Sequence, residues 1–205
     1  MLSRGEKYKK EVSNIVTKIY QNNLSKINFG NVSIFDRKNK IIYIKSSGTY
    51  IDNCKSSDIV PVKLSKKGYE LLSKKKPSVD LPIHIELYKY NNNISSIVHT
   101  HSLYASSFAQ LNIEVPCYGT THSDYFRDAI PISNKIKNIN NTNYENKLSV
   151  SILEKLKKLG DLPRGMLIRD HGVLSWSTTS KQALENAIAI EEISQIAYLV
   201  SNHKL

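Results

Sequence analysis

The sequence has few of the residues that build disulfide frameworks, membrane spans or linkers between domains. Its 205 residues include only two cysteines, Cys54 and Cys117, which cannot form a disulfide framework and lack the spacing of a metal-binding pair. No apolar run approaches the roughly 20 residues that a membrane span needs. The polar first ten residues differ from the apolar region of a signal peptide. We therefore expect a cytoplasmic protein with no membrane partner.

Internal repeats and linkers rich in Gly, Pro or Ser are also absent from the sequence. A chain of 205 residues with 40% hydrophobic and 23% charged residues has the composition of one packed globular domain. We expect a single domain that spans residues 1–205.

Acidic residues are scarce, because 18 Asp and Glu stand against 29 Lys and Arg, a formal net charge of +11. Such a surplus attracts phosphate backbones, so a nucleic-acid partner is one interpretation. Only five of the basic residues are arginine, however, and the basic runs at 74–76 and 155–158 fall in an expected turn and on an expected helix, where solvated lysines are ordinary. We therefore expect no nucleic-acid partner and favour a small, phosphorylated, anionic substrate.

Hydrophobic periodicity predicts a mixed α/β fold. Apolar residues at positions 12, 15, 16 and 19 follow one face of a helix, and short β-branched runs between polar turns predict strands. The expected helices cover residues 7–23, 80–90, 102–111, 147–159 and 180–200. The expected strands cover residues 31–35, 40–45, 58–63, 69–72, 94–100 and 166–169. The segment between 112 and 146 is expected to be irregular, with an exposed Asn-rich loop at 134–146. We predict a largely antiparallel central sheet flanked by helices.

Three histidines form the strongest chemical signal. His99 and His101 flank Thr100 at the end of an apolar strand, and alternate residues of a strand point to the same side, so both imidazoles can face one cation. His171 follows a second short apolar strand and is the natural third ligand of a catalytic zinc site, which uses three protein ligands and an open position. Neutral imidazoles suit Zn²⁺ and its neighbours in the transition series. The alternative is three separate core or surface histidines.

Asp80 opens the helix that contains His84. Ser78 before it suits a helix N-cap or an anion contact, and a carboxylate in the first helical turn is stabilised by the helix dipole. The chemical interpretation is that a carboxylate held near a metal can ligate it or take a proton from a substrate. His84 itself is expected to be structural, and Trp176 is expected in the core.

Three further segments are rich in small polar side chains. Residues 118–126, Tyr-Gly-Thr-Thr-His-Ser-Asp-Tyr-Phe, combine hydroxyl, imidazole, carboxylate and aromatic groups, which indicates a binding loop, although several of these residues are also ordinary turn formers. Residues 29–33 and 45–48 place Gly, Ser and Asn where backbone N–H groups can hold a phosphate, although Ser-Gly turns are common.

Taken together, these segments resemble the class II aldolase/adducin family in their order and approximate spacing. The segments that carry the resemblance are Gly30-Asn31-Val32-Ser33, Ile44 to Gly48, Lys76 to Asp80, Ile97 to Ser102, Gly119 to Phe126 and His171-Gly172. Residues 119–126 are most similar to the L-ribulose-5-phosphate 4-epimerase branch of that family. The resemblance extends from the first helix to about residue 200.

The resemblance implies a class II aldolase-like fold and a cytoplasmic homotetramer with a divalent metal, usually zinc, and with active sites at subunit interfaces. It implies interconversion of L-ribulose 5-phosphate and D-xylulose 5-phosphate by breaking and re-forming the C3–C4 bond. The implied metal ligands are Asp80, His99, His101 and His171. The implied substrate-binding residues are Gly30, Asn31, Ser47, Gly48, Ser78, Val79 and Thr120. The implied catalytic residues are Asp124, Asp80 and His122.

Three positions depart from the pattern of the epimerase branch. Val79 stands where a second serine is usual, and Arg169-Asp170 stands where a His-Ser pair is more frequent. The epimerases have a catalytic tyrosine beyond the last helix, whereas no tyrosine follows Tyr198 here. A class II sugar-phosphate aldolase of the fuculose- or rhamnulose-phosphate type is the nearest alternative, and a non-catalytic adducin-like scaffold is the other.

Overall fold

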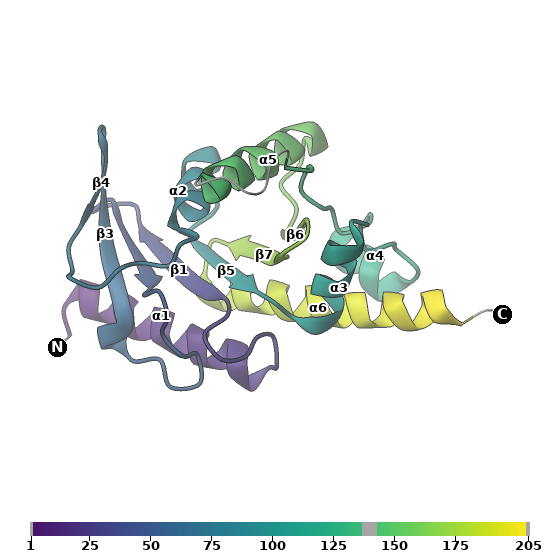
Figure 1. The fold of residues 1–205 in the computed structure, drawn as a ribbon, viewed down its shortest axis with the longest axis horizontal. Helices are drawn as coiled ribbons and strands as arrows, with labels where there is room; N and C mark the ends of the chain where they lie inside the picture. Colours follow the sequence, from purple (N-terminus) through teal and green to yellow (C-terminus); the bar gives the residue numbers. More distant parts are fainter. Residues whose placement is uncertain (1, 137–142, 204–205) are drawn as a thin grey trace.

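The computed structural model describes residues 2–136 and 143–203, which form six α-helices, one short 3-10 helix and seven strands (Figure 1). The helices are α1 (Arg4–Gln21), η1 (Ser56–Asp58), α2 (Leu81–Tyr90), α3 (Leu103–Leu111), α4 (Thr120–Phe126), α5 (Tyr144–Leu159) and α6 (Ser180–Asn202). The strands are β1 (Asn31–Asp36), β2 (Ile41–Lys45), β3 (Ile59–Ser65), β4 (Gly68–Leu71), β5 (Ser96–Thr100), β6 (Gly165–Ile168) and β7 (Gly172–Ser177). The middle of the predicted Asn-rich loop, residues 137–142, lies outside the described residues.

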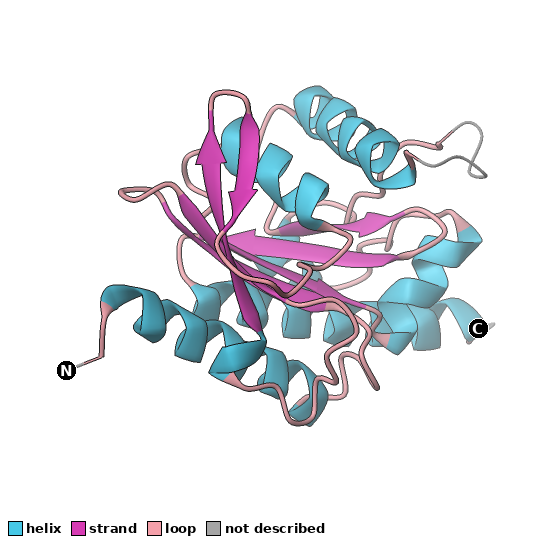
Figure 2. Cartoon of the chain, turned by 60° about the vertical axis from the view of Figure 1, so that its left-hand side comes forward, coloured by secondary structure: helices cyan, strands magenta, loops and turns pink. Residues whose placement is uncertain are grey.

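The seven strands form one sheet in the order β4-β3-β2-β1-β5-β7-β6, and each neighbouring pair is antiparallel. The β1–β2 and β3–β4 hairpins form where polar residues separate apolar or β-branched runs, as the sequence predicts. Helices flank the sheet on both sides (Figure 2). The predicted α/β class with an antiparallel central sheet is therefore confirmed.

Alternation along the strands divides the core between the two faces of the sheet. Ile42 and Ile44 pack with α2 and α5 on one face, whereas Tyr43 packs with α1 and α6 on the other. The predicted apolar face of α1 is buried in that second layer, and Trp176 is buried in the first. In the described part of the chain, no helix has both the length and the hydrophobicity needed to cross a membrane.

Two elements differ from the sequence prediction. Residues 172–177 form the strand β7, between β5 and β6, although Gly172 and two serines weaken the β-strand pattern. Hydrogen bonding to both neighbouring strands outweighs this weak pattern. Residues 120–126 form the helix α4 instead of an irregular binding loop. Thr, Ser and Asp are weak helix formers, but Tyr125 and Phe126 pack against the core layer shared by α3 and α6, and this packing outweighs propensity.

Antiparallel pairing brings the candidate site segments to neighbouring strand ends on one side of the sheet. Asn31 at the start of β1 lies opposite His99 near the end of β5, and Thr100 lies opposite Val173 near the start of β7. β2 ends at the same edge, because Ser33 and Ile44 are paired. Segments that are distant in the sequence, near residues 30, 46, 100 and 171, therefore meet at neighbouring strand ends.

Candidate metal centre

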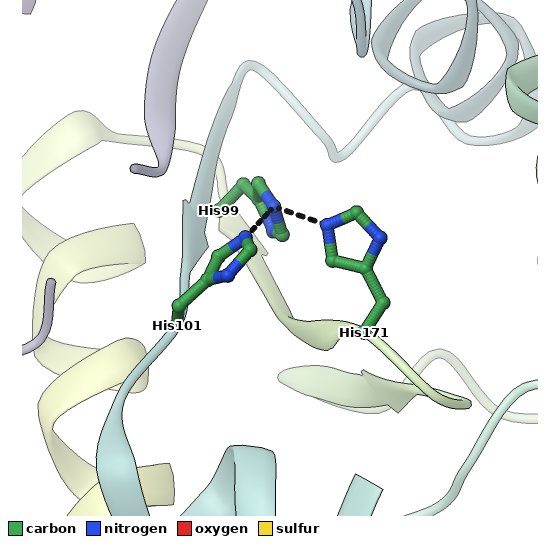
Figure 3. A group of neighbouring side chains, drawn as sticks. All are labelled: His99, His101 and His171. Carbon is green, nitrogen blue, oxygen red and sulfur yellow. Dashed lines mark hydrogen bonds between the residues drawn. The ribbon is translucent and has the colours of Figure 1, made fainter. Parts of the chain in front are cut away.

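The three histidines point their Nε2 atoms at one another (Figure 3). His99 Nε2 lies 3.0 Å from His101 Nε2 and 3.2 Å from His171 Nε2. One ring nitrogen from each residue lies within 4.8 Å of the others. Tetrahedral zinc with bonds of about 2.0–2.1 Å places ligand nitrogens about 3.3 Å apart, so the spacing fits a single metal ion.

The end of β5 positions two of these rings. His99 lies within the strand and His101 directly follows it, so that both side chains lie on one side while Thr100 is buried on the other. The backbone N–H of His101 donates to Ser25 Oγ at 2.7 Å, and its ring stacks on Phe29 with centroids 5.7 Å apart. The chain segment between α1 and β1 therefore supports this side of the cluster.

The third ring is presented by the tight β6–β7 hairpin. Ile168 and Gly172 are paired, so the loop contains only Arg169, Asp170 and His171. The His171 N–H donates to Ile168 O at 3.0 Å, and Asp170 adopts a left-handed φ of 60°. Sequence reasoning placed His171 at a strand end; the hairpin is what turns its ring toward β5.

Two glycines allow the strands to approach this closely. A Cβ on Gly172 would lie 2.6 Å from Thr100 O and 3.3 Å from ring carbons of both His99 and His101. Gly30 has a φ of +77°, and a Cβ there would lie 2.6 Å from His99 O. Gly30 was predicted to bind substrate, whereas the importance of Gly172 for packing was not predicted. The signal available in the sequence was that Gly172 directly follows the candidate ligand His171.

The surroundings keep the imidazoles neutral. His99 Nδ1 donates to Val173 O at 2.8 Å, which leaves a lone pair on Nε2. Burial lowers the pKa of His99 well below its usual value, and it lowers the pKa of His171 as well. The pKa of His101 falls to about 4 because of burial and then the nearby His171. Since metal ligands must be deprotonated, the cluster is ready to take a cation at neutral pH.

Asp80 lies beside the cluster and is itself buried. Its Oδ2 is 3.8 Å from His99 Nε2 and accepts a hydrogen bond from Asn31 Nδ2 at 2.6 Å. Asn31 Oδ1 is buried with no hydrogen-bond partner among the described residues, so it can accept from a ligand. Of the two interpretations of Ser78, the helix N-cap is wrong, because Asp80 occupies the N-cap position of α2. Ser78 Oγ instead lies 3.5 Å from Asp80 Oδ2.

The turn at 45–48, one of the two segments expected to hold a phosphate, lies beside residues 76–78. The Ser47 N–H donates to Lys76 O at 3.0 Å, and the Ser78 N–H donates to Lys45 O at 2.9 Å. They adjoin a cavity of about 350 Å³ that is lined by Ser46, Ser47, Gly48, Thr49, Lys75 and Lys76. Val79, in contrast, is 63% exposed. The turn at 46–49 therefore has both polar donors and lysines around it.

Lys45 is a residue that sequence reasoning missed. Its side chain is buried, and Nζ donates to the carbonyl oxygens of Thr49 at 2.9 Å and Asn28 at 3.2 Å. Burial lowers the pKa of Lys45. The ammonium thus ties the loop before β1 to the turn after β2. The available signal was a lysine within an apolar strand, two residues after the buried Tyr43.

The remaining predicted site residues, Thr120, His122 and Asp124, lie on the helix α4. Figure 1 places α4 beyond α3. His122 is buried, and its Nε2 donates to Asp128 O at 2.9 Å. Thr120 borders one surface cavity, and Asp124 borders another of about 700 Å³ that also includes Arg164. Among the described residues, these side chains line cavities other than the histidine cluster and share no hydrogen bond or ion pair with it.

Comparison with known proteins identifies the family of this chain. Residues 10–198 match the class II aldolase and adducin N-terminal domain. A solved L-fuculose 1-phosphate aldolase is similar with a TM-score of 0.83 and 24% identity, over 98% of this chain and 89% of the other. A sugar-phosphate aldolase from Thermotoga maritima is similar with a TM-score of 0.76 and 18% identity, over 97% of each chain. The L-fuculose-1-phosphate aldolase from Thermus thermophilus is similar with a TM-score of 0.74 and 19% identity, over 98% of this chain and 100% of the other. At these sequence identities, the solved structures support the fold alone. The family match covers most of the chain, so this chain belongs to the class II aldolase and adducin N-terminal domain family.

Proposed function

We propose that this chain is a metal-dependent L-ribulose-5-phosphate 4-epimerase that interconverts L-ribulose 5-phosphate and D-xylulose 5-phosphate. The observation that carries the proposal is the convergence of three neutral imidazoles and a buried carboxylate close to a Ser-Gly turn at one sheet edge. The Gly-Thr-Thr-His-Ser-Asp-Tyr-Phe sequence of residues 119–126 favours the epimerase branch over others of the family.

The metal ligands would be His99, His101, His171 and Asp80, and we propose zinc as the ion. Three nitrogen donors at zinc-like spacing and one nearby carboxylate fit this choice. When bound, the ion would supply the Lewis acidity that polarises a ketone and stabilises negative charge as the C3–C4 bond breaks. Asn31 would hold the carboxylate of Asp80 in place and use its free Oδ1 to accept a hydrogen bond from a substrate hydroxyl.

The substrate phosphate would lie against the turn at 46–49. Ser47, Gly48 and Ser78 would offer backbone or hydroxyl donors, and Gly30 with Asn31 would form the wall toward the histidines. Lysines around the turn would attract the anion. Val79, which is exposed, would contact the substrate from outside the turn, and Thr120 would do so from α4 of a neighbouring subunit.

Inversion at C4 requires an acid/base group on each face of the substrate, one to take the hydroxyl proton and one to return it. We propose Asp124 as one of these groups and Asp80, beside the cluster, as a candidate for the other. Because α4 lies apart from the cluster of its own chain, Asp124 would act in the site of a neighbouring subunit of a homotetramer. His122, bonded to Asp128 O, would hold α4 in the required shape.

The proposal is tested by activity, metal content and subunit mixing. Zinc-loaded protein should convert L-ribulose 5-phosphate into D-xylulose 5-phosphate, and chelation should abolish turnover until zinc is restored. His99→Ala should lose both metal and activity. Mixed tetramers of His99→Ala and Asp124→Asn should regain activity that neither variant has alone, because some sites then combine an intact cluster with an intact Asp124. Absence of conversion by metal-loaded wild type would refute the proposal.

A class II sugar-phosphate aldolase is the second candidate, favoured by the structural similarity to aldolases acting on L-fuculose 1-phosphate and other sugar phosphates. An aldolase would release an aldehyde and a separate three-carbon ketone phosphate from a ketose 1-phosphate, whereas an epimerase retains both fragments until they recombine. Measuring released dihydroxyacetone phosphate from L-fuculose 1-phosphate separates the two. An adducin-like scaffold would give no turnover with either substrate.

A further inference from the structure

Tyr144, the first residue of α5, brings a phenol to the side of His171 that faces away from the other histidines. Its Oη lies 3.4 Å from His171 Nδ1. The two rings are nearly parallel, with an interplanar angle of 6° and centroids 6.3 Å apart. Tyr144 lies within the Asn-rich stretch 134–146 of the sequence, where no periodic pattern distinguishes it. Only the packing of α5 against α2 and the sheet brings it to the cluster.

The two ring nitrogens of His171 have different surroundings. Nε2 points into the cluster, 3.2 Å from His99 Nε2, so ligation through Nε2 requires its lone pair and leaves the ring proton on Nδ1. Nδ1–H then donates to Tyr144 Oη, since a phenol oxygen can accept a hydrogen bond. The distance of 3.4 Å exceeds the usual range of about 2.7–3.2 Å, so this hydrogen bond is weak.

The other two rings are supported by different groups. His99 donates from Nδ1 to Val173 O at 2.8 Å, and His101 stacks on Phe29. Within residues 2–136 and 143–203, Tyr144 is the hydrogen-bond partner of His171 Nδ1. We propose that Tyr144 is a positioning residue, whose hydroxyl fixes the tautomer and ring orientation of His171 for metal binding. This role rests on the proposed metal site.

The physical basis is the support that a metal-bound histidine receives through its second nitrogen. An acceptor at Nδ1–H raises the basicity of the ligand and limits rotation of the ring, and loss of such a partner typically weakens metal binding by about 10- to 100-fold. His171 lies in a short hairpin loop outside the strand pairs, whereas His99 is paired with Asn31 and Leu174 on the two neighbouring strands. Because the Tyr144 contact is long, we expect the lower end of that range.

Tyr144→Phe removes only the hydroxyl and is the direct test. Zinc affinity of the full chain, measured by competition with a chromophoric chelator, should fall about 10-fold. Tyr8→Phe is a matched control, because the Tyr8 hydroxyl also makes one long hydrogen bond, from Arg4 at 3.3 Å, but on α1. A second readout is the ¹⁵N NMR signal of His171 Nδ1 in the zinc form, which should shift in Tyr144→Phe and stay unchanged in Tyr8→Phe.

The possible outcomes distinguish this role from the proposed function. Reduced zinc affinity together with a shifted Nδ1 signal supports the role of Tyr144. Wild-type affinity and an unshifted signal in Tyr144→Phe overturn it, even when His99→Ala still abolishes zinc binding and the metal site itself stands. A wild-type chain that binds no zinc removes the metal site and the role of Tyr144 with it.

Discussion

Replacing Gly172 by alanine should destabilise the fold and weaken metal binding at the same time. The added methyl group would lie 2.6 Å from Thr100 O and 3.3 Å from ring carbons of His99 and His101, so β5 and β7 would have to move apart. Overpacking of this kind costs about 1–3 kcal/mol in free energy of unfolding. For a chain of this size, about 2–4 °C per kcal/mol gives a fall in melting temperature of roughly 2–12 °C.

Thermal unfolding with chelator and with excess zinc measures both effects. At a free zinc concentration of about 100 times Kd, binding stabilises the wild-type fold by about 2.7 kcal/mol. In Gly172→Ala the displaced rings should bind zinc more weakly, so the same concentration should raise the melting temperature less. The control is Gly119→Ala: no atom lies within 4 Å of the added Cβ, and only loss of the glycine N-cap of α4 is expected.

A Gly172→Ala variant that melts at the wild-type temperature and gains the same stability from zinc would refute this reasoning. It would mean that the hairpin accommodates the methyl group without moving the histidine rings. A variant that is less stable but binds zinc normally would separate strand packing from ligand geometry, and would remove the claim that Gly172 serves the site.

Three further predictions concern the site residues. Asp80→Asn should lower zinc affinity by at least about 10-fold, as measured by chelator competition, because Asn cannot supply the negative charge beside His99; unchanged affinity would remove Asp80 from the ligand set. Asp124→Asn should lower epimerisation by about two orders of magnitude while zinc affinity stays constant, and a wild-type rate would assign the proton transfer elsewhere. In zinc-free protein, denaturant unfolding should show stability falling as the pH drops from about 6.5 toward 4. Over this range unfolded histidine binds protons that folded His101, with a pKa of about 4, does not. His101→Asn should flatten this decline.

Local sequence pattern was sufficient for much of the fold and for placing His99 and His101 on one side of a strand end. The apolar face of α1 and the polar breaks of the β1–β2 and β3–β4 hairpins depend on neighbouring residues alone. The spacing of His99 and His101 is also local, because strand geometry places alternate side chains on one side. These features needed no knowledge of which segments pack together.

Tertiary structure decided the features whose cause is distant in the sequence. β7 is a strand because β5 and β6 supply its hydrogen bonds, and α4 is a helix because its aromatic residues reach the core. Lys45 shows only a weak local signal, a lysine within an apolar strand, and Tyr144 shows none. Their roles follow from carbonyl groups and an imidazole contributed by other segments.

The sequence by itself therefore determined which residues can bind a metal and the type of fold that carries them. Only the tertiary structure decided how His171 meets His99 and His101, that Gly172 must lack a side chain, and that Asp124 borders a separate cavity with Arg164. The physical reason is that side-chain direction depends on local backbone geometry, whereas distances between strands depend on packing across the whole sheet.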